Sequence, residues 1–128
     1  MGGKTIVVGL LSAFFLFASS IKILGWQKAI FEPQLAMFIK YGLSRQIMML
    51  TGLVELFGAI AIWFQQSWVG TLGALALLGT SVGAVVCHLY FDTWKEGVPA
   101  LITGTLSALI AWVNRVPLID LLNLAGTN

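Results

Sequence analysis

Residues 46–64 read QIMMLTGLVELFGAIAIWF, an apolar run that carries one formal charge, Glu55, near its middle. About 19 residues at a rise of ~1.5 Å make a helix of roughly 28 Å, close to the thickness of the hydrocarbon core of a bilayer. A carboxylate at that depth is costly. We therefore expect Glu55 to face other helices or a wet cavity and to have a partner.

The composition of the whole chain agrees with this interpretation. Its 128 residues are 59% hydrophobic and 9% charged, and the mean hydropathy is +0.95. So little polar surface cannot cover a soluble globule, and a chain of this length has room for one bundle of about four spans. The prediction is all-α: a single transmembrane domain over residues 1–128, folded as an integral membrane four-helix antiparallel bundle.

Several classes of function are disfavoured by the residue counts. The net charge of +2 comes from scattered residues, so no basic stripe suggests nucleic acid. A single cysteine, Cys87, excludes both an intrachain disulfide and a CxxC redox pair. One histidine, one cysteine and scattered carboxylates make no metal-ligand set, and no bound-cofactor motif is present.

Three further predicted spans lie before and after residues 46–64. A cleaved signal peptide is the alternative for the first apolar run, but that run continues through Ile23 and Leu24 and favours a retained helix. Pro33 after Glu32 predicts the start of a short interfacial helix. The predicted elements are spans at about 5–24, 46–64, 67–91 and 97–113, an interfacial helix at 33–41 and a surface segment at 117–124.

Small residues predict where helices approach one another closely. Gly79 and Gly83 stand four residues apart, the spacing that lets helix backbones come together. Gly52 and Gly58 in the charged span are assigned the same packing role. Whether the ridge of Gly79 and Gly83 faces its own bundle or a second copy of the chain stays open.

Counting depth along the antiparallel spans groups the charges. Lys22 ends the first span, His88 ends the third, and Glu55 lies roughly 14 Å inside the same membrane face. Lys22 with Glu55 is the natural buried pair, and His88 is a second titratable neighbour. In the alternative, Lys22 and His88 reach out to lipid headgroups while hydroxyl groups bind Glu55. The candidate hydroxyl side chains of this polar cluster are those of Ser19, Thr51, Ser81 and Ser107.

Three stretches resemble the DoxX-like family of membrane proteins. They are Phe15, Ser19 and Lys22 in the first span, GLVELFGAIAI over residues 52–62, and GAVVCHL over residues 83–89. The resemblance covers residues 8 to 113 and implies a four-helix membrane bundle with the lysine, glutamate and histidine in or near a polar pocket. The family is named for an association with a thiosulfate:quinone oxidoreductase. Other members are linked to membrane oxidoreductase complexes or to chaperoning membrane proteins.

Functions of different classes fit this cluster. The first is an accessory or ligand-binding subunit of a membrane redox complex, whose pocket around Glu55 holds a quinone, a lipid or a similar amphiphile. The second is an enzyme in which Glu55 transfers protons, although no catalytic residue is assigned. The third is a proton-coupled small-molecule transporter, which a lysine beside Glu55 disfavours because the neutralised glutamate exchanges protons less freely.

Partners and location follow from the same features. The expected partners are the lipid bilayer and either a membrane oxidoreductase or a second copy of the chain. We expect a multi-pass protein of the bacterial inner membrane. One membrane face holds four basic residues, Lys28, Lys40, Arg45 and Lys95, and the other face holds two, Lys4 and Arg115. The positive-inside rule therefore places the first face in the cytoplasm and both termini outside.

Overall fold

The structure is a computed structural model that describes residues 2–126. Within this range the chain forms six α-helices and one short 3-10 helix and no strand. In order, they are α1 (Gly3–Leu24), α2 (Lys28–Lys40), α3 (Arg45–Ala61), α4 (Trp68–Phe91), η1 (Trp94–Gly97), α5 (Val98–Val113) and α6 (Arg115–Gly126).

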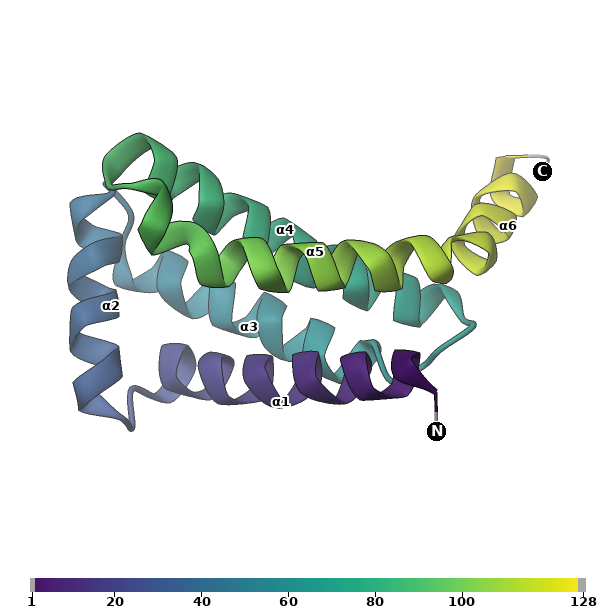
Figure 1. The fold of residues 1–128 in the computed structure, drawn as a ribbon, viewed down its shortest axis with the longest axis horizontal. Helices are drawn as coiled ribbons and strands as arrows, with labels where there is room; N and C mark the ends of the chain where they lie inside the picture. Colours follow the sequence, from purple (N-terminus) through teal and green to yellow (C-terminus); the bar gives the residue numbers. More distant parts are fainter. Residues whose placement is uncertain (1, 127–128) are drawn as a thin grey trace.

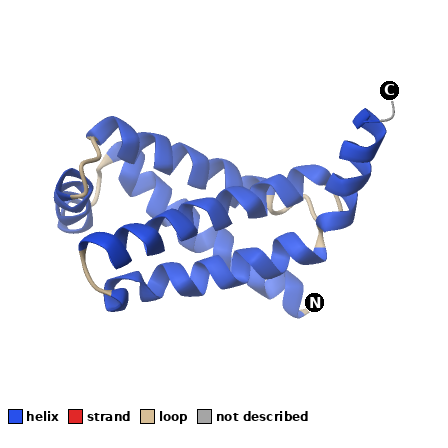
Figure 2. Cartoon of the chain, turned by 90° about the horizontal axis from the view of Figure 1, so that it is seen from above, coloured by secondary structure: helices blue, strands red, loops and turns tan. Residues whose placement is uncertain are grey.

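Four of these helices form an antiparallel bundle (Figure 1). α1 packs mainly against α3, α3 against α4, and α4 against α5, whereas α1 and α5 contact each other much less. α2 lies across one end of the bundle, and both termini lie at the other end (Figure 1). The view from above again places α2 at the end of the bundle away from the termini (Figure 2).

The helices match the requirements of a membrane bundle. Three helical segments of the described chain, α1, α4 and η1 with α5, are long and apolar enough to cross a bilayer. α3 has 17 residues, and a fourth span is counted when α2 and α3, bent by 117° at their break, are taken together. The predicted all-α membrane bundle is confirmed.

The helix ends are set by local sequence signals. Gly25 ends α1 in a left-handed conformation with φ of 66°, which glycine adopts without steric cost. The side chain of Ser44 accepts a hydrogen bond from the Ile47 N–H and caps α3, as its position before the span suggests. Ser67 caps α4 in the same way through the Gly70 N–H.

The short helix after α1 differs from its prediction. α2 begins at Lys28, five residues before the predicted start, and Pro33 lies inside the helix. The ring of Phe31 packs against Gly25, and the Arg45 guanidinium lies 4.9 Å from the centre of the same ring. These contacts with neighbouring segments fix the first turn, and they outweigh the hydrogen bond that proline cannot donate.

Two other helices, α3 and α6, also differ from their predicted bounds by a few residues. α3 ends at Ala61 rather than at Phe64, because the chain turns there toward the next helix. The C-terminal segment forms a longer helix than residues 117–124, since α6 covers Arg115–Gly126. No residue of α6 is buried, and the helix contacts α4.

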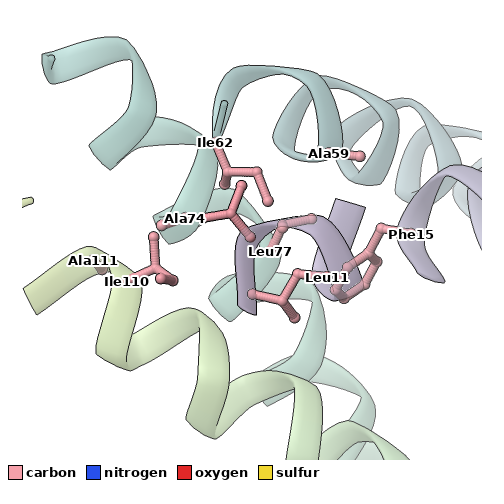
Figure 3. Packing of buried hydrophobic residues seen from close by; sticks show 9 residues of the cluster. Leu11, Phe15, Ala59, Ile62, Ala74, Leu77, Ile110 and Ala111 are labelled. Carbon is pink, nitrogen blue, oxygen red and sulfur yellow. The ribbon is translucent and has the colours of Figure 1, made fainter. Parts of the chain in front are cut away.

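The hydrophobic core occupies the half of the bundle near the termini. All four helices of the bundle contribute to it (Figure 3). Its buried residues are Val8, Leu11, Phe15, Ala59, Ile62, Ala74, Leu77, Ile110 and Ala111. The other half of the bundle, toward α2, contains the polar residues that the sequence singled out.

Candidate functional site

Lys22 of α1 and Glu55 of α3 form a buried ion pair. The Lys22 Nζ atom lies 3.0 Å from Glu55 Oε1, and the two residues are 8% and 5% exposed. No hydrogen bond joins Glu55 Oε1 to another group in the described part of the chain, although the Lys22 ammonium group lies beside it. The contact is therefore one of charge, and this oxygen can still accept a hydrogen bond.

A glycine and an arginine position the pair. A Cβ atom on Gly52 would lie 2.9 Å from the Lys22 Cβ atom, so glycine is what lets α3 approach α1 here. The guanidinium of Arg45 donates hydrogen bonds to the carbonyl groups of Lys22 at 2.7 Å and Ile23 at 2.9 Å. A cation at the C-terminal end of a helix donates hydrogen bonds to the last carbonyl groups of the helix and interacts favourably with the helix dipole. Arg45 therefore fixes the turn of α1 that carries Lys22.

A second polar cluster joins α2 to the end of α4. Tyr41 donates a hydrogen bond to Asp92 Oδ2, and its oxygen lies 2.9 Å from His88 Nδ1. The Lys40 ammonium lies 2.5 Å from Asp92 Oδ1. His88 is bonded to Tyr41 and Asp92 rather than to the Lys22–Glu55 pair.

The electrostatics of this cluster favour an ionised aspartate. Hydrogen bonds from Lys40 and Tyr41 lower the pKa of Asp92 to about 2. Burial, together with the hydrogen bond to Asp92, raises the pKa of Tyr41 above its ordinary value. Asp92 therefore stays an acceptor and Tyr41 a donor across the physiological pH range.

Lys22 and Glu55, together with Tyr41 and His88 of the second cluster, line one cavity of about 610 Å³. Phe14 and Phe15 of α1, Phe38 of α2 and Leu75 of α4 give it apolar walls. Its polar lining residues include Lys22, Gln34, Thr51, Glu55, Ser81 and His88. A cavity of this size with a few converging polar groups is typical of a small-molecule site.

The predicted hydroxyl residues divide into two groups. Thr51 and Ser81 line the cavity. Ser19 and Ser107 are buried and donate to the carbonyl groups of Leu16 and Thr103 on their own helices. They are not among the lining residues, so their hydroxyl groups satisfy the backbone instead.

The predicted packing glycines also divide. A Cβ on Gly58 would lie 2.6 Å from Leu77 Cδ2, so α3 and α4 meet closely there, as α3 and α1 do at Gly52. A Cβ on Gly79 or Gly83 would meet no described atom within 4 Å. These two glycines line the cavity rather than join helices of this chain. Large side chains at these positions would occupy part of its volume.

Several site residues were missed by the sequence analysis. Gln34, Tyr41 and Asp92 belong to the cavity or its second cluster, and Arg45 was considered only as a loop charge. The four-residue spacing of His88 and Asp92 was a usable signal, because such residues share a helix face. In residues 2–126, no three histidine, cysteine, aspartate or glutamate side chains converge to hold a metal ion.

The sequence itself can be compared with known families. The sequence model of the DoxX-like family matches residues 6–113, which cover the four-helix bundle except for the first three residues of α1. The chain belongs to the DoxX-like family. No curated protein and no solved structure matches it significantly. This DoxX-like chain is thus a small multi-pass membrane protein whose family assignment agrees with its apolar helices.

Proposed function

We propose that this DoxX-like protein binds a small amphiphile in the cavity beside Lys22 and Glu55. The headgroup would lie against the ion pair, and the tail would run along the aromatic and aliphatic walls. The observation that carries this proposal is Glu55 Oε1, a buried carboxylate oxygen that lacks a hydrogen-bond partner within the described chain. Leaving a buried acceptor unsatisfied costs about 1–3 kcal/mol, and more for a charged group, so a ligand that donates to it would relieve this cost.

A side groove supports an entry from the bilayer. An apolar groove of about 260 Å³ lies between α1 and α5, a pair that contact each other much less than the other neighbouring helices of the bundle do. It shares Phe14, Pro99 and Thr103 with the cavity. An apolar tail could therefore pass between α1 and α5 while its headgroup stays at Glu55. A quinone and a lipid both have this general shape.

Co-purification from the membrane tests the proposal. The protein is extracted in a mild detergent and analysed by native mass spectrometry for bound amphiphiles. We expect about one bound molecule per chain in the wild type, and its loss in Gly79→Leu and Gly83→Leu, whose side chains enter the cavity. Val86→Leu is the matched control, since Val86 is exposed on α4 and does not line the cavity. Equal occupancy in all four proteins would overturn the proposal.

The finer roles remain predictions. A link to a membrane oxidoreductase, a chaperone role, self-association and a location in the bacterial inner membrane are suggested by the family resemblance and the sequence. The alternative of proton-coupled transport is weakened because Lys22 already neutralises Glu55. A substrate-dependent proton flux into liposomes containing the protein would revive it.

A further inference from the structure

Carboxylates outnumber cationic side chains in the described lining of the cavity. Among its described lining residues, Lys22 is the one lysine or arginine, and it is already paired with Glu55. Glu96 adds a second carboxylate to the lining. An anionic headgroup would therefore meet two carboxylates and an ammonium group that already has a partner.

Apart from the Lys22 ammonium group, the charged groups of the lining, Glu55 and Glu96, offer only hydrogen-bond acceptors when ionised. An ionised carboxylate such as Glu55 only accepts hydrogen bonds. His88 Nδ1 is already engaged: the Tyr41 hydroxyl group donates its hydrogen bond to Asp92 Oδ2, so the Tyr41 oxygen accepts from His88 Nδ1. The Gln34 amide can present either an acceptor or a donor, because its two ends differ only by a flip.

We propose that this cavity selects amphiphiles whose headgroup donates hydrogen bonds and carries no negative charge. Hydroxyl groups of a glycerol head have this chemistry, whereas carboxylate heads and heads with acceptors alone do not. The proposal rests on the proposed function and names the chemistry of its ligand. The donor hydroxyl group would satisfy the free lone pairs of Glu55 Oε1 and leave the contact with Lys22 intact.

Three probes with one tail separate these headgroups. Monooleoylglycerol supplies donors without charge, methyl oleate supplies acceptors alone, and oleate supplies a negative charge. Each is loaded at the same level into phosphatidylcholine nanodiscs that hold the full chain, at a pH where oleate is ionised, and occupancy is read by native mass spectrometry. Sugar-headed detergents are avoided because their hydroxyl groups would compete.

The expected result is a preference for monooleoylglycerol of about tenfold or more over each of the other probes, since a hydrogen bond to a charged group contributes roughly 1.5–3 kcal/mol. Glu55→Gln keeps the shape of the side chain, adds a donor and leaves Lys22 unpaired. This variant should lose the preference and bind oleate more tightly than the wild type does. Glu32→Gln makes the same chemical change at an exposed position of α2 outside the cavity, and it should keep the wild-type order.

The outcomes distinguish the two proposals. Equal binding of all three probes, displaced together by Gly79→Leu, would leave amphiphile binding in place and overturn the selectivity. A preference for oleate in the wild type would also overturn the selectivity. Binding of none of the probes would overturn both proposals. If Glu55→Gln fails to fold, the order of the three probes on the wild type decides by itself.

Discussion

Lys22 and Glu55 place two opposite charges inside a low-dielectric bundle. Their burial is costly, and their mutual attraction offsets that cost only while both partners are present. In buried pairs, removal of one partner costs on the order of 3–5 kcal/mol, because the remaining charge has lost its counterion. Stability at this site should therefore depend on both residues together.

A double-mutant cycle measures that dependence. Lys22→Met and Glu55→Gln should each lower the free energy of unfolding in detergent, and the double variant should lose less than the two losses added. We expect a coupling energy of about 1 kcal/mol or more. Lys95→Met, at an exposed lysine outside the pair, should add to Glu55→Gln without coupling. A coupling energy of zero between Lys22 and Glu55 would show that each side chain is stabilised separately.

The lowered pKa of Asp92 predicts how the stability of the protein changes with pH in acid. Its pKa in the folded protein is lowered to about 2, whereas an unperturbed aspartate has a pKa of about 3.9. The ionised carboxylate therefore stabilises the fold fully above about pH 4, and this contribution is lost as the pH falls through about 2. Asp92→Asn should remove this part of the pH dependence of the melting temperature.

The matched control for this titration is Asp120→Asn, at an exposed position on α6. Its melting temperature should follow the wild-type curve between about pH 5 and 2. If Asp92→Asn and the wild type lose stability in parallel over this range, then Lys40 and Tyr41 do not hold the Asp92 carboxylate as the structure describes.

At the scale of the helices, the glycines have two different surroundings: Gly58 lies where two helices pack closely, and Gly83 lines the cavity. Gly58→Leu places its Cβ 2.6 Å from Leu77 Cδ2 and 2.9 Å from the Gly73 carbonyl oxygen. Because this second contact is with backbone, α3 and α4 must move apart, and we expect a loss of roughly 1–3 kcal/mol in the free energy of unfolding or more. Gly83→Leu enters the cavity and should change stability little. Equal losses would contradict the packing described for these two faces.

Depth along a helix was predictable from the sequence, but the direction of a helix face was not. A constant rise of ~1.5 Å per residue allowed the pairing of Lys22 with Glu55 to be predicted from counting alone. The four-residue spacing of Gly79 and Gly83 predicted that another helix packs closely against them. Spacing alone does not tell which helix, or which cavity, that face of α4 meets. Tyr41 reaches His88 only because the chain bends by 117° between α2 and α3.

Across the whole molecule, most of the hydrophobic core and the cavity occupy different halves of the bundle. The half near the termini holds the hydrophobic core. Asn114, 1% exposed, joins the turn between α3 and α4 to the end of α5. Its side chain accepts a hydrogen bond from the Gln66 N–H at 3.1 Å and donates one to Gln65 Oε1 at 2.8 Å. The half near α2 holds the ion pair and the cavity.

This separation predicts opposite effects of two substitutions. Asn114→Leu removes the hydrogen bonds from its buried side chain to Gln65 and Gln66 in the turn. At about 0.5–1.5 kcal/mol for each bond lost, it should cost about 1–3 kcal/mol of stability, with little effect on amphiphile occupancy in the protein that stays folded. Gly79→Leu should lower amphiphile occupancy and change the free energy of unfolding little. Melting temperatures and native mass spectra of the two variants check this, and a variant pair that changed both properties together would contradict it.

Photolabelling tests most directly whether the cavity holds a headgroup. A monooleoylglycerol analogue with a photoreactive group at its head is bound to the protein in nanodiscs, activated by light, and mapped by mass spectrometry of the digested chain. We expect labels at residues around the ion pair, such as Ala18, Thr51 and Glu55, and their loss in Gly79→Leu. Labels confined to exposed positions such as Val82, Val86 and Leu89, unchanged in Gly79→Leu, would contradict this expectation.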